Sequence, residues 1–318
     1  MPNRLARALA ALLLSVAAAA CASDGPPPPK LVPEKDTIAV GVLPVADTAP
    51  LFVAIAKGYF RQEGLTVEPQ VISGAAMAVP MLEARRLDLG QTDYVTTFMA
   101  GAVGKHLKVV APLSQAGADG YGVVVGKDSG IDSVKELKGK KVAVNNLYGL
   151  GTLMVTAMLE NAGLTDRDVR FVEMPFPDMA QRIGSGKVDA AWVAEPFLTY
   201  GERRGLVREL PDPVPGRLAD QPVSGWMATD EFRERYPRTL AAFQRGLAKG
   251  LRDAADRKEV EAALPKYTKI DADTAAQVSL GTYPTDLDRR RVQQVADLME
   301  RHGYLKNPLD VTSFLATG

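Results

Sequence analysis

The sequence predicts a mixed α/β protein with two α/β lobes, joined by a hinge of two chain crossings and followed by a helical C-terminal region. From Thr37 onward, short runs rich in β-branched residues alternate with helix-like stretches, a pattern typical of parallel α/β structure. A second complete set of such elements follows residue 126. A strand-like run at Val223–Ala228 can return the chain to the first set, which gives the two crossings.

The first lobe is predicted over residues 37–125 and 223–318, and it opens with a strand at Thr37–Leu43. Proline is tolerated in the first turn of a helix, so Pro50 favours a helix over Pro50–Glu63. Further strands are expected at Leu65–Val71, Leu87–Gln91 and Lys108–Leu113, and further helices at Met81–Arg86 and Val95–Ala102. The strand expected at Tyr121–Val125 leaves the lobe. The strand ends of an open α/β sheet deliver loops to one edge, where such folds bind ligands.

The second lobe is predicted over residues 126–222. Its short helix at Ser133–Leu137 has two candidate N-caps, which are Asp132 and Ser133 in a capping box with Glu136. Its further strands are expected at Lys141–Asn145, Val169–Met174 and Val188–Val193. One helix is expected at Thr152–Ala162, closed by Gly163, and another opens with the capping pair Asp178 and Gln181 and ends near Gly184. A proline-rich loop is expected at Leu210–Pro222.

The region after Val223–Ala228 is predicted to be helical. Apolar residues recur there at spacings of three and four, which predicts amphipathic helices with one buried face. These positions are Leu240, Phe243, Leu247, Leu251 and Ala254 in one helix, and Val292, Val295, Ala296 and Met299 in another. We assign them to the core and give them no functional role.

Two short segments resemble each other. Glu83–Gly90 and Gly184–Ala191 both place a basic turn and an aspartate at the junction of a helix and a strand. We interpret this as one supersecondary plan used in both lobes.

The N-terminus predicts export. Arg4 and Arg7 precede an apolar run that ends at Ala20, and this run is shorter than the roughly 20 residues that cross a bilayer. Residues 1–20 are therefore predicted to be a signal peptide. The only cysteine, Cys21, follows them and resembles the lipidated cysteine of bacterial lipoproteins, although Ala18 stands where that signal prefers leucine. The alternative is an ordinary cleaved signal in which Cys21 has no role.

A proline-rich segment over residues 21–36 follows the signal peptide. Pro26–Pro29 and Pro33 exclude a helix and supply no donors for a sheet, so we expect an extended spacer. The chain carries 38 basic and 38 acidic residues, without the basic excess that nucleic-acid binding requires. With one cysteine, the fold can form no internal disulfide.

Three segments carry a resemblance to a known family. Ala49–Glu68 closely resembles the opening helix and strand of the nitrate/sulfonate/taurine and thiamine-precursor (NMT1/THI5-like) solute-binding proteins. Ser133–Val144 and Gly186–Ala191, the latter with Glu195-Pro196 following, are further matches in the same order. Arg85 stands where this family usually has glycine. The resemblance implies a type II periplasmic-binding-protein fold that closes its lobes on a small molecule and delivers it to an ABC permease.

The ligand is expected between the lobes, where strand ends and helix starts present free backbone N–H groups. The predicted ligand-binding residues are Thr48, Gln91, Thr92, Asp93, Tyr94 and Ser114 in the first lobe, and Asn145, Tyr148, Gly149, Gly151, Thr152, Trp192 and Glu195 in the second. The glycine-rich turn at Tyr148–Thr152 is a candidate anion cradle, and its alternative is a simple turn with a threonine cap. Among Tyr94, Tyr148, Trp192 and Trp226, we favour Trp192 for stacking on a ligand.

Asp93 and Glu195 are acidic, and no arginine lies in the candidate loops. A ligand with an amine or a heterocyclic N–H group suits this set better than nitrate or sulfate. Alternatively, Asp93 caps the following helix and Glu195 braces a turn. The resemblance leaves the ligand open among sulfonates such as taurine, thiamine-pyrimidine precursors and related heterocycles.

Enzyme chemistry has little support in the sequence. The only histidines, His106 and His302, have no convincing catalytic partner, and no metal-ligand spacing, nucleophile elbow or phosphate-binding P-loop occurs. We therefore expect a monomeric, lipid-anchored, extracytoplasmic binding protein without cofactor or metal. Two alternatives remain: an extracytoplasmic enzyme on the same fold acting on a small aromatic or sulfur compound, and a degenerate binding domain that acts as a sensor.

Overall fold

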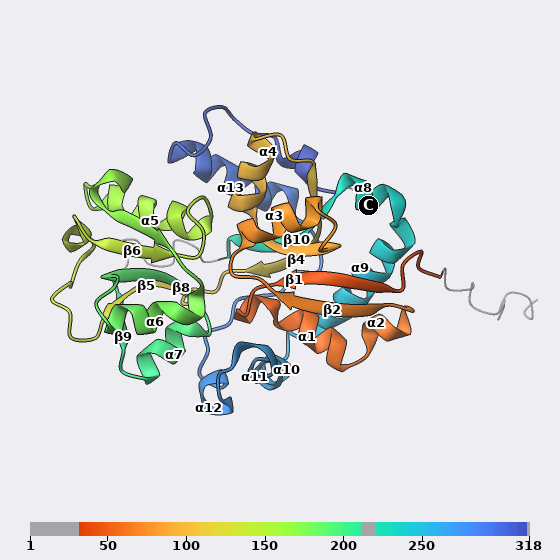
Figure 1. Cartoon of the computed structure of the whole chain (residues 1–318), viewed down its shortest axis with the longest axis horizontal. Coiled ribbons are helices and arrows are strands. Elements are labelled where there is room, and N and C mark those ends of the chain that lie inside the picture. The colour runs from red at the N-terminus through yellow and green to blue at the C-terminus, as the bar shows by residue number, and fades with distance from the viewer. Residues whose placement is uncertain (1–31, 212–219, 317–318) are drawn as a thin grey trace, which may run out of the picture. The chain divides into compact units, whose positions relative to one another are not determined.

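Two five-stranded β-sheets form the framework of the protein (Figure 1). The computed structural model describes residues 32–211 and 220–316, so the predicted signal peptide, Cys21 and most of the predicted spacer lie outside the described residues. The first sheet has the strand order β2-β1-β3-β10-β4, and the second has the order β7-β6-β8-β5-β9. In each sheet the first three strands are parallel, and the fourth is antiparallel to both neighbours.

The first lobe departs from the sequence prediction mainly in its helices. The single helix expected over Pro50–Glu63 is two helices, because Gly58 adopts a left-handed φ of 70° between them. The helix expected from Met81 starts at Ala75. The strands are β1 (Thr37–Val42), β2 (Thr66–Val71), β3 (Leu89–Asp93), β4 (Leu107–Gln115) and β10 (Pro222–Thr229), and the helices are η1 (Ala46–Thr48), α1 (Ala49–Ala56), α2 (Tyr59–Gln62), α3 (Ala75–Glu83) and α4 (Tyr94–Ala102).

The second lobe follows the predicted order of elements but differs in detail, and helix α7 is an addition to it. Ser133 and Glu136 form the capping box, so this alternative holds and Asp132 is not the cap. The helix expected to open at Asp178 begins directly after Pro175, whose fixed φ suits a helix start. An edge strand, β9, was not expected. The strands are β5 (Tyr121–Gly126), β6 (Lys141–Val144), β7 (Arg170–Glu173), β8 (Ala190–Ala194) and β9 (Val207–Leu210), and the helices are η2 (Val134–Leu137), α5 (Leu150–Asn161), η3 (Asp166–Asp168), α6 (Phe176–Gly184) and α7 (Phe197–Arg203).

The C-terminal region is helical, as predicted, and both apolar stripes are buried. In Figure 1, α9 lies beside α1 and α2, and α13 lies beside α4. The helices are α8 (Asp230–Arg235), α9 (Pro237–Asp253), α10 (Arg257–Ala263), α11 (Pro265–Thr268), α12 (Ala272–Ala275), α13 (Arg289–Arg301) and η4 (Val311–Phe314).

The chain crosses between the sheets twice. Tyr121, the first residue of β5, already pairs with Ala194 of the second sheet. The first crossing therefore lies between Gln115 and Tyr121, and the predicted lobe boundary at residue 125 is too late. The return crossing lies between β9 and β10, where residues 212–219 fall outside the described part of the chain. Each sheet thus contains one antiparallel strand that adjoins a crossing.

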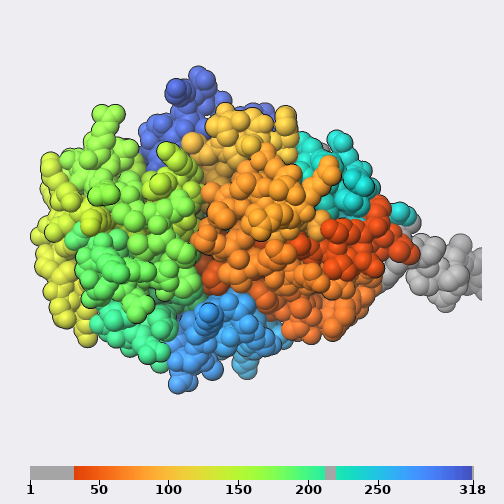
Figure 2. Space-filling view, viewed as in Figure 1, coloured from red at the N-terminus to blue at the C-terminus, as the bar shows by residue number. Residues whose placement is uncertain are grey.

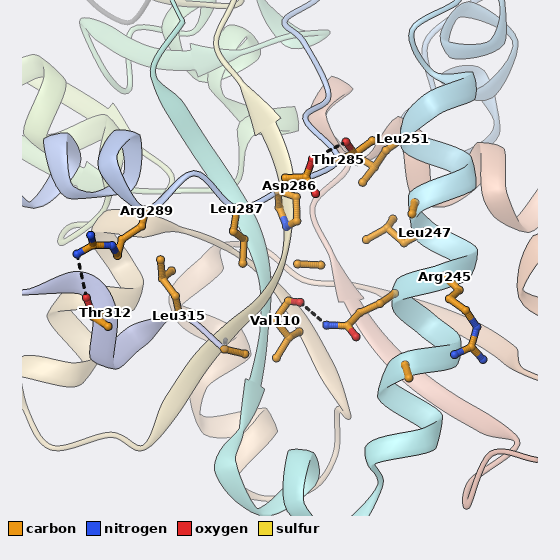
Figure 3. A pocket seen from close by; sticks show the side chains of 16 residues that line it. Val110, Arg245, Leu247, Leu251, Thr285, Asp286, Leu287, Arg289, Thr312 and Leu315 are labelled. Carbon is orange, nitrogen blue, oxygen red and sulfur yellow. Dashed lines mark hydrogen bonds between the residues drawn. The ribbon is translucent and has the colours of Figure 1, made fainter. Parts of the chain in front are cut away.

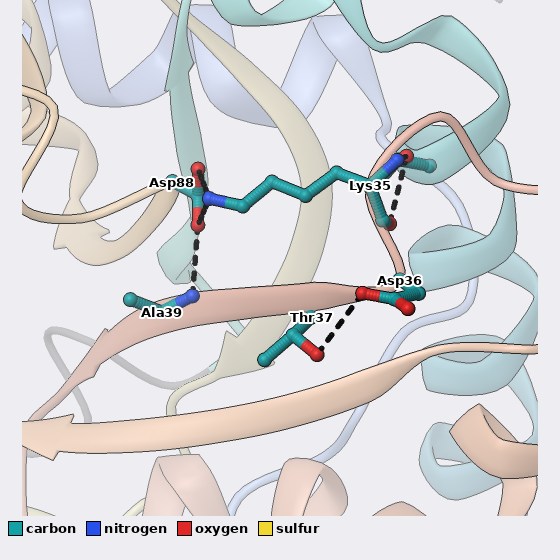
Figure 4. A network of polar contacts seen from close by, with 6 residues as sticks. Lys35, Asp36, Thr37, Ala39 and Asp88 are labelled. Carbon is teal, nitrogen blue, oxygen red and sulfur yellow. Dashed lines mark hydrogen bonds and ion pairs between the residues drawn. The ribbon is translucent and has the colours of Figure 1, made fainter.

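The internal sequence similarity corresponds to one repeated structure. Asp88 accepts a hydrogen bond from the backbone N–H of Ala39 at 2.8 Å (Figure 4), and Asp189 accepts one from Lys141 at 2.8 Å. In both cases the aspartate at the start of a strand ties it to the neighbouring parallel strand. The turn before it is left-handed in both lobes, with φ of 54° at Arg85 and 68° at Gly186.

Arg85→Gly should stabilise the protein. A left-handed conformation costs a residue with a Cβ about 1 kcal/mol, and glycine removes that cost. The change also removes the exposed ion pair between Arg85 and Glu231, which stabilises by less than about 1 kcal/mol. We expect a net gain of a few tenths to about 1 kcal/mol in urea denaturation. Glu231→Ala, which removes this ion pair together with the longer contact to Arg235 at 4.0 Å, is the control. A less stable Arg85→Gly protein would contradict the expectation.

The segment before β1 is docked on the first lobe. Glu34 accepts hydrogen bonds from the backbone N–H groups of Thr239 at 2.8 Å and Arg238 at 3.1 Å, at the start of α9. Lys35 places its Nζ 2.7 Å from both carboxylate oxygens of Asp88 (Figure 4). The spacer predicted to extend to residue 36 therefore ends earlier, because Glu34 and Lys35 are already part of the folded body.

Glu34→Ala should destabilise the protein in a pH-dependent way. Partial burial opposes ionisation of Glu34, but hydrogen bonds from its own backbone, Thr239 and Arg238 outweigh it and lower the pKa from 4.5 to about 2. A lowered folded-state pKa contributes stability above the unfolded value, and this is lost as the pH falls toward the folded value. We expect a loss of about 1–2 kcal/mol above pH 5 that shrinks between about pH 4.5 and 2. A pH-independent loss in urea titrations would contradict this assignment.

Candidate functional site

A cavity of about 40 Å³ lies between the two lobes. It sits at the carboxyl ends of the parallel strands β1, β3, β6 and β8, where loops from both sheets meet. Its lining residues are Leu43, Val45, Asp47, Gln91, Thr92, Asp93, Tyr121, Asn145, Leu150, Gly151, Phe176, Trp192, Ala194, Val223 and Ser224. Both lobes thus contribute apolar, aromatic and polar residues to the lining of one cavity.

The structure brings six of the predicted site residues to this cavity. They are Gln91, Thr92, Asp93, Asn145, Gly151 and Trp192. Gly151 permits the close packing of α5 on β8, because a Cβ at this position would lie 2.5 Å from Cδ1 of Trp192. The indole ring of Trp192 lies against Tyr121, with ring centroids 5.9 Å apart and planes 15° apart. The residue favoured for stacking therefore does form an aromatic wall.

Two other predicted residues lie behind the cavity wall. Thr48 is fully buried, and its hydroxyl contacts both Oε1 of Gln91 and the backbone oxygen of Leu43 at 2.7 Å. Ser114 donates to Oδ2 of Asp47 at 2.5 Å. These side chains orient groups that line the cavity but do not line it themselves.

Tyr94, Tyr148, Gly149 and Thr152 do not line the cavity either. Tyr94 is only 2% exposed and packs in the core beside Phe98. Gly149 lies against Thr96 and Asn146. Tyr148 and Thr152 line a separate hollow of about 450 Å³, next to His302. Among the rejected stacking candidates, Trp226 is fully buried against Phe243.

Glu195 braces the lobes instead of lining the cavity. Its carboxylate accepts hydrogen bonds from the hydroxyl of Thr199 at 2.6 Å, from the N–H of Thr199 at 3.0 Å and from the N–H of Ser279 at 3.0 Å. Its backbone oxygen accepts from Ala46 at 2.8 Å. Ala46 and Ser279 lie outside the second lobe, so the predicted alternative role as a local brace fits and extends to a contact between lobes.

Sequence reasoning missed Asp47. It lies in η1, directly after β1, and is only half-buried because it faces the cavity. Oδ2 of Asp47 accepts hydrogen bonds from Ser114 at 2.5 Å, from Tyr121 at 2.6 Å and from Ser224 at 3.3 Å. Asp47 belongs to the loop that was expected to contribute, so its charge was the signal that could have identified it.

Tyr121, Phe176 and Ser224 were also missed. Tyr121 would have been found if the first crossing had been placed before β5, because the strand then starts at the lobe boundary. Phe176 and Ser224 carry no local signal, since the start of α6 and the register of β10 place them at the cavity. Only the packing of the two sheets identifies these residues.

The carboxylates of Asp47 and Asp93 are both difficult to ionise. Burial raises the pKa of Asp47, although the hydroxyls of Ser114, Tyr121 and Ser224 partly offset this. Burial likewise raises the pKa of Asp93, against hydrogen bonds from Thr96 and Leu150. Burial and the adjacent Asp47 raise the pKa of Tyr121. The cause in each case is loss of solvation without a neighbouring positive charge.

Asp93 joins the two lobes at this site. It caps α4 by accepting from the N–H of Thr96 at 2.8 Å, as the alternative interpretation of this residue predicts. The same oxygen lies 3.3 Å from the N–H of Leu150, at the start of α5 in the other lobe. The candidate anion cradle at Tyr148–Thr152 therefore already faces a carboxylate of the protein itself.

The lobes are in contact around the cavity. Asn146 donates to the hydroxyl of Thr96 at 2.8 Å, in addition to the contacts of Asp93, Asp47 and Glu195 described above. Figure 2 shows the atoms of the second lobe, in yellow and green, abutting those of the first lobe, in orange. This arrangement encloses the cavity.

A larger hollow of about 620 Å³ lies elsewhere, between α9, the edge strand β4 and the C-terminal segment (Figure 3). Its polar side chains are engaged by the protein: Gln244 donates to the backbone of Val110 at 2.7 Å, and Arg289 lies 3.4 Å from the hydroxyl of Thr312. Arg245 points away from the hollow and pairs with Glu63 at 2.8 Å. Without converging free polar groups, this hollow is a weaker candidate than the inter-lobe cavity.

Within residues 32–211 and 220–316, no group of three or more His, Cys, Asp or Glu side chains is arranged to hold a metal ion. Over the same ranges, none of the helices has the length and apolar character that a membrane span requires.

Comparisons with known proteins agree on the architecture. The chain is 26% identical to a putative aliphatic sulfonates-binding protein of Bacillus subtilis, over 83% of this chain and 81% of that protein. It is 27% identical to the 4-amino-5-hydroxymethyl-2-methylpyrimidine phosphate synthase THI13 of Saccharomyces cerevisiae, over 49% of this chain. Several relatives, this synthase included, are matched over only 38% to 49% of their own length.

Among solved structures, the alkanesulfonate-binding protein SsuA of Xanthomonas axonopodis pv. citri superposes with a TM-score of 0.76. The match covers 90% of this chain and 99% of that chain at 16% identity, and it shows the type II periplasmic-binding-protein fold. The sequence model of the family described as NMT1/THI5 like matches residues 45–260. The chain therefore belongs to the NMT1/THI5-like family and has its two-lobed solute-binding fold.

Proposed function

We propose that this protein is the extracytoplasmic substrate-binding component of an ABC importer. The observation that carries the proposal is the inter-lobe cavity, to which each lobe contributes polar and aromatic side chains. Enclosure between two lobes allows a receptor to surround a small ligand and to signal occupancy by its closed form. A relative named as a sulfonate-binding protein and structural neighbours from import systems support this role.

The ligand is a small polar metabolite, and the partner is a membrane permease. We propose that Gln91, Thr92, Asp93, Asn145, Gly151 and Trp192 contact the ligand, together with Asp47 and Tyr121. Thr48 and Ser114 hold these side chains in position. We propose that the protein acts as a monomer.

The binding role is tested by thermal shift with the purified mature protein. The panel contains sulfonates including taurine, aliphatic and aromatic amines, pyrimidines and flavins. At least one class should raise the melting temperature, because a ligand that binds only the folded state stabilises it. Trp192→Phe should reduce this shift, whereas Tyr148→Phe, outside the cavity, should preserve it. Absence of any stabilising compound would count against the binding role.

We further propose that Cys21 is lipidated and that residues 22–33 tether the body to a membrane. The position of Cys21 after the predicted signal peptide supports this. Cells given a labelled fatty acid should transfer the label to the protein, and Cys21→Ser should abolish the transfer. Label retained in Cys21→Ser, or absent from the parent protein, would refute lipidation.

An enzymatic role on this fold has weaker support. The matched synthase is aligned over 45% of its own length, and this partial match does not assign its activity to this chain. The lining residues of the cavity include no histidine, cysteine or lysine among the described residues that could serve as nucleophile or base near neutral pH. We therefore favour capture of an unchanged ligand, which mass spectrometry of natively purified protein would detect.

A further inference from the structure

The inter-lobe cavity has negatively charged groups and no described positive partner. Asp47 belongs to the first lobe at η1, and Asp93 lies at the end of β3. The described residues that line the cavity include no lysine, arginine or histidine. An anionic ligand would therefore enter next to two carboxylates without a compensating cation, which is unfavourable in a poorly solvated site.

The start of α5 could attract an anion, but Asp93 already occupies it. The backbone N–H of Leu150, at the first turn of this helix, lies 3.3 Å from Oδ1 of Asp93. A carboxylate at this position satisfies the helix N–H group and the positive end of its dipole. A sulfonate or nitrate ligand would have to displace this internal contact.

The remaining walls suit a cation. The rings of Tyr121 and Trp192 lie almost parallel beside the cavity, and Phe176 contributes a third aromatic side chain. Aromatic faces attract cations, and this attraction is greatest in desolvated sites. Asn145 adds a side-chain oxygen that can accept a hydrogen bond from an N–H donor, whereas Oε1 of Gln91 already accepts from the N–H of Leu43 at 2.8 Å and contacts the hydroxyl of Thr48 at 2.7 Å.

The cavity is also small. About 40 Å³ corresponds to roughly three water-sized groups, since one needs about 10–15 Å³ on this measure. In the closed arrangement the charged part of the ligand must therefore be compact and of the size of an amidine or a short amine. A larger ligand requires a wider separation of the lobes.

From these observations we propose that the ligand is a small organic cation with N–H donors, such as a protonated amine, an amidine or a cationic amino-heterocycle, and that Asp47 is its principal counter-ion. The proposal rests on the binding role given above and specifies its ligand class. Asp47 is favoured over Asp93 because Asp93 accepts hydrogen bonds from the backbone N–H groups of Thr96 and Leu150, whereas the donors to Asp47 from other residues are the hydroxyl groups of Ser114, Tyr121 and Ser224.

Three compounds of nearly equal size separate the alternatives. Acetamidinium, acetamide and acetate have the same planar heavy-atom frame but carry positive, zero and negative charge. Isothermal titration calorimetry with the mature protein should detect acetamidinium at millimolar concentration, with affinity at least about tenfold above that of acetamide or acetate. Affinity should rise with pH as the carboxylates ionise, because the probe stays protonated.

Asp47→Asn keeps the shape of the side chain and removes its charge. It should lower acetamidinium affinity at least about tenfold and flatten the pH dependence. Asp128→Asn, an exposed residue in the turn after β5, is the matched control and should behave as the parent protein. Circular dichroism verifies that both variants fold.

Preferential binding of acetate or of a sulfonate would overturn the cation assignment and leave the binding role intact. Equal affinities of Asp47→Asn and the parent for acetamidinium would remove Asp47 as counter-ion. If acetamidinium fails to bind, the cation assignment is wrong, and the thermal-shift panel then separates the two proposals. If the panel reveals a ligand, the binding role stands. If it reveals none, the binding role is rejected together with the cation assignment.

Discussion

Glu195→Ala is expected to lower the free energy of unfolding by about 2–4 kcal/mol. The carboxylate of Glu195 is 3% exposed and receives hydrogen bonds from two backbone N–H groups and one hydroxyl. Alanine leaves the N–H groups of Thr199 and Ser279 without this acceptor inside the protein. Because Ser279 follows the helices of the C-terminal region, the loss also loosens a contact between that region and the second lobe.

Urea denaturation at neutral pH measures this effect. Glu234→Ala, an exposed glutamate on α8, is the matched control and should change stability by less than about 0.5 kcal/mol. Ligand affinity of the folded Glu195→Ala protein should change less than that of Asp47→Asn, because Glu195 does not line the cavity. If both glutamate variants are equally stable, Glu195 does not brace the lobes.

Asp47→Asn is expected to have the opposite signature, with a more stable ligand-free protein and weaker binding. Burial raises the pKa of Asp47, so the folded protein holds its proton more tightly than the unfolded chain. A raised folded-state pKa makes stability fall as the pH rises from the unfolded value of about 3.8 through the folded value. Asparagine removes this titration and retains an oxygen that can accept from Ser114 and Tyr121.

The expected gain is about 1–2 kcal/mol at pH 7, a common size for a functional group held in an unfavourable environment. The difference between Asp47→Asn and the parent should be smallest near pH 3 and should grow toward neutral pH. Thermal or urea denaturation of ligand-free protein across this range measures it. A less stable variant at pH 7 would show that the hydroxyl contacts outweigh the desolvation of the charge.

These predictions assign different roles to two carboxylates that look alike in sequence. Asp47 and Glu195 both follow strands and both lie near the contact between the lobes. Asp47 receives hydroxyl groups of Ser114 and Tyr121 and lines the cavity, while Glu195 receives two backbone N–H groups and one hydroxyl and does not line it. Donor type and orientation thus separate a candidate ligand contact from a structural brace.

The sequence predicted the order of strands and helices in both lobes because that information is local. Short runs rich in β-branched residues predicted the strands, spacings of three and four predicted the buried faces of α9 and α13, and the Ser133–Glu136 pair predicted a cap. Errors arose where a distant neighbour decides the outcome. The strand β9 forms because β5 offers it an edge, and β5 belongs to the second sheet through its pairing with β8.

The same distinction between local sequence information and contacts of distant residues applies to the site. The sequence by itself predicted a site at strand ends between two lobes, because alternating elements bring such loops to one edge. Three of the predicted residues, Gln91, Asp93 and Trp192, line the inter-lobe cavity. Only the tertiary structure selected Asp47 and Tyr121, moved Glu195 to a brace and placed Asp93 against the start of α5. The reason is physical: cavity lining and solvation depend on which chain segments meet across the lobes, and residues far apart in the sequence carry no local signal of that contact.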